Sequence, residues 1–148
     1  MLTSLKVLDH INTDTKIIDE ISLSYEDRFI RRKKLIANNG TEFLVNLEET
    51  KSVDENYYFK LDSGEAIKVI SKEENLIQIT GDNIKQIIWH IGNRHLPCQI
   101  EESRILIQED SVIKEMIIKL GGNVTNVVEK FKPEGGAYGM GRTHSHQH

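Results

Sequence analysis

The chain ends in GRTHSHQH, in which three histidines alternate with other residues as His144, His146 and His148. Alternate side chains of an extended chain lie on one side, so these imidazoles can converge on a single ion. Neutral imidazole is a good ligand for nickel, copper, zinc and cobalt. The spacing therefore favours a metal-binding tail over a purification tag, which is more often an uninterrupted histidine run, and over a merely solvated end.

His95 is the second candidate ligand, and it belongs to a polar Asn-Arg-His cluster in GNRHLPCQIEE. A lone histidine at a helix end is more often structural than a ligand, because the negative end of the helix dipole stabilises it. Composition alone favours that structural interpretation. One imidazole cannot hold a transition metal firmly unless a twofold dimer brings two copies together and the tails supply further ligands.

The remaining histidines and the single cysteine are weaker candidates. One cysteine, Cys98, excludes both a CxxC site and an internal disulfide. In a strand its side chain would lie on the same face as those of Leu96 and Ile100. This position predicts a buried apolar side chain rather than a thiolate ligand. His90 lies off the apolar face of its predicted helix, which predicts an exposed or interface position, and His10 has no obvious co-ligand.

No pattern of residues indicates catalysis. The chain contains no GxSxG, HExxH or P-loop lysine motif. Glu101 and Glu102 should point to opposite faces of a strand, so they cannot act jointly on one substrate atom. The basic run Arg28 to Lys34 is typical of a solvated face. We therefore expect a protein that is not an enzyme.

Composition excludes several classes of partner. A formal net charge of -4 over 148 residues argues against a general nucleic-acid or membrane-surface role. The strand-like segments LPCQI and RILIQ hold no aromatic residue on which RNA bases could stack. The N-terminus lacks a signal-peptide pattern, and no apolar run approaches the roughly 18 residues of a membrane span. We expect a cytoplasmic protein with no nucleic-acid or membrane partner.

The first half of the chain has the pattern of an all-β domain. Asn39-Gly40 separates two strand-like runs, and Asp62-Ser63-Gly64 separates residues 57–61 from residues 66–70. Both are hairpin signals, because their residues tolerate the positive φ of tight turns. The charged stretch from Ser71 to Asn75 has the polarity of a linker or a domain edge, which places a domain boundary near Lys72.

The second half predicts the order β-α-β-β-α-β between about Leu76 and Phe131. A first helix is indicated by apolar residues at i, i+3, i+4 and i+7, namely Ile84, Ile87, Ile88 and Ile91. Gly92 offers a stop to this helix. Asp110 or Ser111 can cap the second helix, and Gly121-Gly122 can end it.

These elements predict an α+β chain. Residues 1–72 form an all-β domain, and residues 73–132 form a ferredoxin-like βαββαβ domain. Residues 133–148 hold one proline and four glycines among few apolar residues, which predicts a flexible tail.

Four segments in this order, GNRHLP with QIEE, KFKPEGGAYG and GRTHSHQH, resemble the UreE family of urease accessory proteins, the nickel chaperones of urease maturation. YEDRFIRRKKL and NNGTEFLVNL resemble the β-rich N-terminal domain of that family, so the resemblance covers nearly the whole chain. The combination of GNRH, PEGGAYG and a terminal histidine cluster is more specific than any single segment.

The resemblance implies a role for each domain. Residues 1–72 would bind protein partners or peptides, and residues 73–132 would bind metal and form a homodimer. In such a dimer, two copies of His95 bind one nickel ion at the interface, with help from His144, His146 or His148. The partners implied are the urease apoprotein complex and the urease accessory GTPase.

The sequence departs from the family pattern in two places. Some members carry an H-D-H cluster where this chain has Glu109-Asp110-Ser111, so no second metal site is expected there. Met140 stands where relatives often have a histidine. A short tail favours nickel transfer over storage. Zinc or copper can also bind such ligands in vitro, and the alternative function is a zinc-linked dimeric interaction module or a metal scavenger that delivers no nickel.

Overall fold

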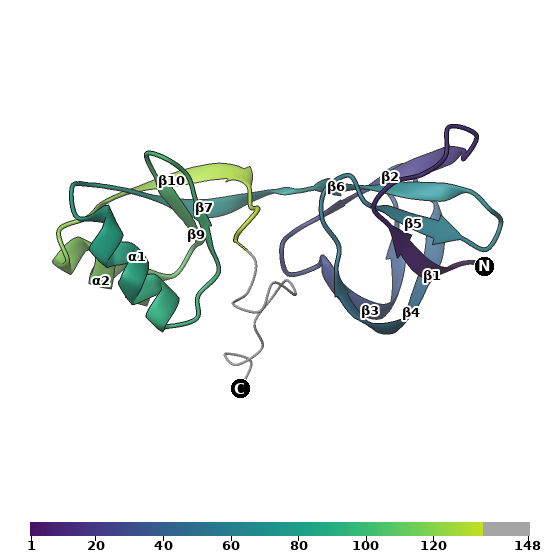
Figure 1. Cartoon of the computed structure of the whole chain (residues 1–148). Helices are drawn as coiled ribbons and strands as arrows, with labels where there is room; N and C mark the ends of the chain where they lie inside the picture. Colours follow the sequence, from purple (N-terminus) through teal and green to yellow (C-terminus); the bar gives the residue numbers. More distant parts are fainter. Residues whose placement is uncertain (135–148) are drawn as a thin grey trace. The chain divides into compact units, whose positions relative to one another are not determined.

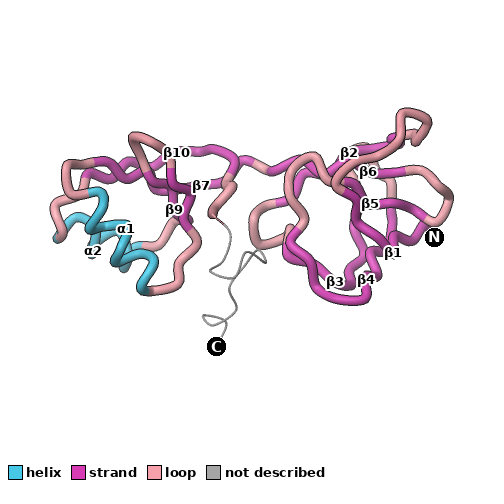
Figure 2. Tube along the Cα trace, viewed as in Figure 1, coloured by secondary structure: helices cyan, strands magenta, loops and turns pink. Residues whose placement is uncertain are grey.

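Residues 1–134 are described in this computed structural model, and within them ten β-strands and two α-helices follow one another (Figure 1). The chain divides into two units between Lys72 and Glu73. Figure 2 shows that both helices belong to the C-terminal unit, whereas the N-terminal unit consists of strands and loops. The predicted α+β class, with a β-rich first half, is therefore confirmed.

The N-terminal unit is built on one six-stranded sheet with the order β2-β6-β5-β1-β4-β3. Its strands are β1 (Leu2–Leu8), β2 (Ile17–Leu23), β3 (Phe29–Ile36), β4 (Glu42–Ser52), β5 (Tyr58–Leu61) and β6 (Ala66–Ser71). Fully buried Phe43 and Phe59 pack with their ring centroids 5.5 Å apart in its core. This packing joins β4 to β5, two strands that β1 separates in the sheet.

Both predicted hairpins are present. Between β3 and β4, the N–H of Ala37 donates to the carbonyl of Thr41 at 2.8 Å, and Gly40 adopts a φ of +94°. Between β5 and β6, Gly64 adopts a φ of +93°. Glycine carries no Cβ that would clash in this left-handed region, which explains its place in both turns.

A buried carboxylate holds the first of these hairpins. Asp19 on β2 is 4% exposed and accepts hydrogen bonds from the backbone N–H of Asn39 at 3.1 and 3.2 Å. The Asn39 side-chain amide donates to it at 3.1 Å as well. Burial alone would raise the pKa of Asp19, but bonds from the Thr41 side chain and from backbone N–H groups outweigh burial and lower it. The carboxylate therefore stays ionised and fastens the turn to a distant strand.

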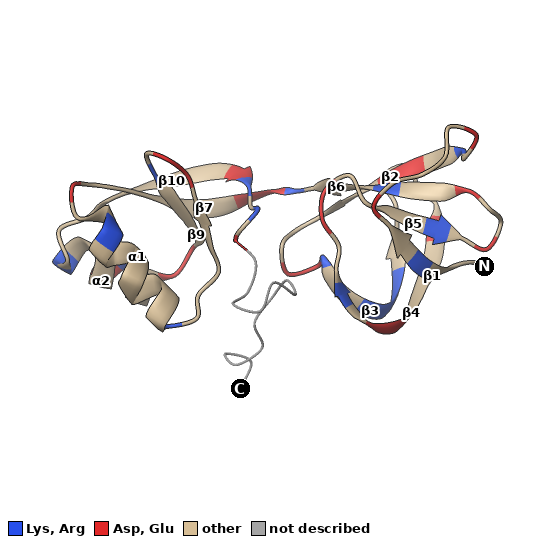
Figure 3. Cartoon of the chain, viewed as in Figure 1, with Lys and Arg blue, Asp and Glu red and all other residues tan. Residues whose placement is uncertain are grey.

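One expectation for this half is wrong. Arg28 is not part of a solvated face: it is 3% exposed, and its guanidinium donates to the carbonyl of Leu23 at 3.1 Å. Of the basic run, Arg31 to Lys34 are exposed, and the ribbon of β3 is coloured blue for basic residues in Figure 3. Of the two interpretations of the stretch from Ser71 to Asn75, the domain edge fits and the linker does not. β6 ends at Ser71 and β7 begins at Glu73, so only Lys72 lies between the two strands.

The C-terminal unit has a four-stranded antiparallel sheet with two helices on one face. Its elements are β7 (Glu73–Thr80), α1 (Ile84–Asn93), β8 (Cys98–Ile100), β9 (Ile105–Gln108), α2 (Ser111–Lys119) and β10 (Asn123–Lys130). The sheet order is β10-β7-β9-β8, and every neighbouring pair is antiparallel. The predicted order of strands and helices is therefore present.

Helix α1 buries the apolar stripe that the sequence indicated, and α2 packs on the same core. Ile87 and Ile91 of α1 and Ile117 of α2 are fully buried against isoleucines of β7 and β9. Asp110 caps α2, accepting from the N–H groups of Val112 and Ile113 at 2.9 and 3.1 Å. This cap was one of the two that the sequence allowed.

Candidate metal-binding site

His95 lies in the turn that joins α1 to β8, and its side chain is exposed. The N–H of His95 donates to the carbonyl of Gly92 at 3.0 Å, and that of Leu96 donates to Ile91 at 3.3 Å. These two bonds form a Schellman motif, in which the residue after the C-cap takes the left-handed conformation. That residue is His95, with a φ of +57°.

This geometry corrects the expectation that Gly92 stops the helix. Helix α1 continues through Gly92 to Asn93, and Arg94 is its C-cap. Glycine is the usual residue at the left-handed position, because a Cβ is unfavourable there. A histidine in this conformation costs conformational free energy. Residues held in such strained conformations are concentrated at functional sites, which favours a functional role for the exposed imidazole. Leu96 packs against the core of the C-terminal unit and so holds the turn in place.

The other described histidines lie in different surroundings. His90 is half-buried on α1, with its ring edge-on to Trp89 at a centroid distance of 5.1 Å. Such an orientation is a favourable aromatic contact and gives the ring a structural role. His10 is exposed in the N-terminal unit, where its Nδ1 lies 2.6 Å from a carboxylate oxygen of Asp9.

Within residues 1–134, no three side chains of histidine, cysteine, aspartate or glutamate gather closely enough to hold a metal ion. His95 therefore has no preformed ligand cluster in the described part of one chain. The predicted tail ligands His144, His146 and His148 lie outside the described residues, as does Met140.

Cys98 lies three residues after His95 and is half-buried against the core of the C-terminal unit. Burial, followed by the negative charge of Glu134, raises the pKa of the Cys98 thiol. A raised pKa keeps the thiol protonated at neutral pH, and the thiolate is the metal-binding form. The structure agrees with the predicted apolar role.

Two glutamates of the C-terminal unit, Glu101 and Glu129, are held in an ion-pair network. Glu101 and Glu129 both accept from the guanidinium of Arg104, at 3.0 and 2.7 Å. The hydrogen bond from Arg104 is the main cause of the lowered pKa of Glu101 and of Glu129, and it raises the pKa of Arg104. The sequence did not predict this ion-pair network, because Glu129 and Gln78 are 25 and 26 residues from Arg104 in the chain.

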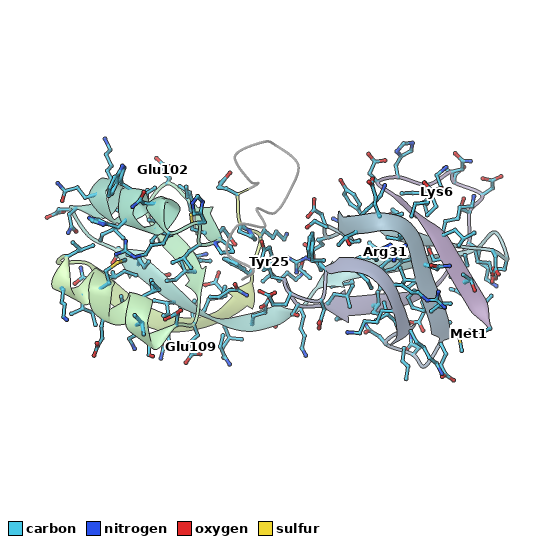
Figure 4. All side chains as sticks on the ribbon, turned by 90° about the horizontal axis from the view of Figure 1, so that it is seen from below. Met1, Lys6, Tyr25, Arg31, Glu102 and Glu109 are labelled. Atoms are coloured by element: carbon cyan, nitrogen blue, oxygen red, sulfur yellow. The ribbon has the colours of Figure 1, made fainter. Side chains whose placement is uncertain are left out.

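The expectation for Glu101 and Glu102 rested on a strand that is shorter than predicted. β8 ends at Ile100, so both residues lie in the turn before β9. Glu101 turns into the Arg104 network, whereas Glu102 is exposed. Figure 4 shows Glu102 and Glu109 at opposite ends of the C-terminal unit.

A shallow depression of about 250 Å³ lies beside the His95 turn. It is lined by Leu96, Pro97, Ile107, Gln108, Glu109, Asp110 and Ile113. The Asp110 carboxylate is occupied as the cap of α2. The depression thus offers apolar walls and one exposed carboxylate, Glu109, which are too few donors for a second metal site.

The C-terminal segment returns to the same turn. The N–H of Glu134 donates to the carbonyl of Cys98 at 2.9 Å, so the described chain ends beside β8. The side chain that precedes β8 by three residues is that of His95. The start of the histidine-containing tail and the candidate ligand are therefore on the same edge of the unit.

Comparison with known proteins decides the family. The profile of the UreE urease accessory protein C-terminal domain matches residues 74–148. The chain belongs to the UreE family of urease accessory proteins. The urease accessory protein UreE of Ruegeria pomeroyi is 51% identical over 130 residues, which are 88% of this chain and 87% of the relative. UreE of Rhodobacter capsulatus is 47% identical over 88% of this chain and 83% of the relative.

UreE membership confirms the predicted resemblance and the non-enzymatic class. UreE proteins are accessory proteins of urease, so this chain has a role in urease maturation rather than a catalytic activity of its own. No helix among residues 1–134 is long and apolar enough to cross a membrane.

Proposed function

We propose that this UreE chain is a nickel metallochaperone that delivers Ni(II) for assembly of the urease active site. Nickel is its cargo. Two copies of His95, one from each protomer of a homodimer, bind the ion, and His144, His146 or His148 complete the coordination. The observation that carries the proposal is the exposed imidazole of His95, held by a Schellman turn in a conformation that costs backbone energy.

A homodimer is required by the chemistry of the site. One imidazole does not bind a transition metal firmly, and no cluster of three ligands surrounds His95 within residues 1–134. A twofold axis near the turn doubles the number of imidazoles without any further residue type. The strand order β10-β7-β9-β8 supports a ferredoxin-like assignment for this unit, whose helices cover only one face of the sheet.

The tail can reach His95. His144 follows Glu134 by ten positions, and a fully extended chain spans up to ~3.5 Å per residue, or roughly 35 Å. Glu134 is hydrogen-bonded to Cys98, three residues from His95. Ligands on such a chain can leave one at a time, which suits transfer of the ion to a partner.

The division of roles follows the two units. Residues 1–72 bind partner proteins, residues 73–132 form the dimer and its metal site, and residues 133–148 supply extra ligands. The partners are the urease apoprotein complex and the urease accessory GTPase. We place this exchange in the cytoplasm. Disulfides are typical of secreted proteins, and a chain with one cysteine cannot form an internal disulfide.

The proposal is tested by nickel titration calorimetry, with mass in solution measured alongside, on the intact protein, a His95→Asn variant and a chain ending at Arg142. Asparagine tolerates the left-handed conformation, so this change removes the imidazole with little strain. We expect His95→Asn to abolish the tight site and the truncation to weaken it. His10→Asn is the matched control, and it should leave nickel binding unchanged.

Nickel binding that survives His95→Asn would overturn the interface site and leave the tail as an independent scavenger. The zinc-linked module is separated by competition and transfer. If zinc displaces nickel at equal concentrations and loaded protein fails to activate apo-urease, the metal holds the dimer together and is not delivered.

A further inference from the structure

We propose that residues 131–134 form an anchor that holds the start of the tail beside the His95 turn, with Phe131 and Gln99 as positioning residues. This inference rests on the proposed function, because it concerns how the tail histidines are presented to the same metal site. The chain turns back directly after β10 (Figure 1).

The anchor covers the face of the sheet that the helices leave open. Leu76 and Leu106 alternate with isoleucines that pack against the helices, so they point to the opposite face. They are nevertheless only 1% and 0% exposed. Phe131 is 0% exposed, and the N–H of Lys132 donates at 2.8 Å to Gln99, the register partner of Leu106. The segment therefore reaches this face at Gln99, where a buried Phe131 is placed to cover it together with the side chains around Arg104.

Two hydrogen bonds attach the segment to β8. The first joins the N–H of Lys132 to the side-chain oxygen of Gln99 at 2.8 Å. The second joins the N–H of Glu134 to the carbonyl of Cys98 at 2.9 Å. Because both acceptors belong to the strand that directly follows the His95 turn, the attachment sets where the tail begins.

Gln99 is itself held in orientation. Its side-chain nitrogen donates to Glu101 at 2.7 Å, so its oxygen is left to face Lys132. Arg104 fixes Glu101 in turn, at 3.0 and 3.1 Å. The Arg104 network thus does more than pair charges, because it orients the amide that receives the C-terminal segment.

Without the anchor the tail would start at the wrong edge. β10 and β8 are the two edges of the sheet, and three strand spacings of ~4.8 Å place them roughly 14 Å apart. A released chain would begin at Lys130 and carry four more free residues before His144. Both changes lower the effective concentration of the tail imidazoles at His95, by roughly two- to fourfold.

Nickel affinity, measured in a thermodynamic cycle, tests this role. The anchor is broken with Phe131→Ala/Gln99→Met, in the intact chain and in the chain ending at Arg142. We expect nickel affinity to fall roughly two- to fourfold in the intact chain and to stay unchanged in the truncated one. Gln78→Met is the matched control: Gln78 also bonds Arg104, at 2.9 Å, and the register places its side chain on the same face as Leu106. It should leave nickel affinity unchanged.

A second variant protects the test against loss of the fold. Gln99→Met/Glu134→Pro removes both hydrogen bonds and leaves Phe131 in the core. Amide hydrogen exchange is measured on the same proteins. The N–H groups of Lys132 and Glu134 should be protected in the wild type. In this variant position 134 carries no N–H, and the N–H of Lys132 should lose its protection while β7 keeps its own.

The outcomes separate this inference from the proposed function. Unprotected Lys132 and Glu134 amides in the wild type would overturn the anchor itself. An equal loss of nickel affinity in the intact and truncated chains would overturn its role toward the tail. Failure of the proposed function looks different, since nickel binding would then survive His95→Asn.

Discussion

The backbone N–H of Glu134 lies 2.9 Å from the carbonyl oxygen of Cys98, and this bond joins the end of the described chain to the strand after the His95 turn. Residues 36 positions apart in the sequence thereby become neighbours. The same approach brings the Glu134 carboxylate close enough to contribute, after burial, to the raised pKa of the Cys98 thiol.

Replacing Cys98 by alanine should leave nickel affinity unchanged. The thiol stays protonated because its pKa is raised, and a protonated sulfur is a poor nickel ligand. Calorimetry and near-ultraviolet absorption of the nickel-loaded protein check this. A thiolate-to-nickel absorption band that vanishes in Cys98→Ala would show that the cysteine is a ligand after all.

Replacing His95 by glycine should stabilise the C-terminal unit while removing the metal site. Glycine adopts a φ of +57° without a Cβ clash, so we expect a gain of about 1 kcal/mol in the free energy of unfolding. Urea denaturation measures it. His90→Gly is the matched control, because His90 is inside α1, where glycine lowers stability by up to about 1 kcal/mol. A destabilised His95→Gly protein would mean that the histidine side chain makes contacts worth more than the strain.

Removing the Asp19 carboxylate should destabilise the N-terminal unit. Asp19→Ala leaves the N–H groups of Glu20 and Asn39 without their acceptor, and we expect a loss of about 3 kcal/mol. Thermal or urea unfolding of the intact chain detects it. Asp14→Ala, at an exposed position, is the control and should change stability by less than about 0.5 kcal/mol.

Acid should remove the same stabilisation. The folded-state pKa of Asp19 is lowered, so its contribution is fully present above the unfolded pKa of about 3.9 and is lost as the pH falls through the folded value. Unfolding free energy measured between pH 7 and pH 2 should decline less steeply below pH 4 in Asp19→Asn than in the wild type. Parallel curves would show that the carboxylate is not preferentially ionised in the fold.

Adding a methyl group at Gly122 should destabilise the C-terminal unit. A Cβ built there would lie 2.7 Å from Cδ1 of Ile87 and 2.8 Å from Cγ2 of Ile117, two fully buried side chains. Overpacking of this kind costs about 1–3 kcal/mol. Gly92→Ala is the control, because nothing lies within 4 Å of its Cβ position and alanine favours the helix. Thermal unfolding should therefore move in opposite directions for the two variants.

The sequence by itself determined the elements and their boundaries wherever local chemistry is decisive. Asn39-Gly40 fixed a hairpin because a tight turn needs positive φ, and Asp110 fixed the start of α2 by capping it. The motifs around His95 also indicate the UreE family, because residue types at fixed spacing are a property of the sequence alone.

Only the tertiary structure decided which distant groups meet. Nothing local predicts that Arg28 and Phe131 are buried, or that Arg104 binds Glu129. The predicted stop at Gly92 was wrong for a related reason. Helix α1 continues to Asn93, so that His95 takes the left-handed position and Leu96, the next residue, packs on the core. Packing over long sequence separations sets these contacts, and a pattern read along one chain carries no information on them.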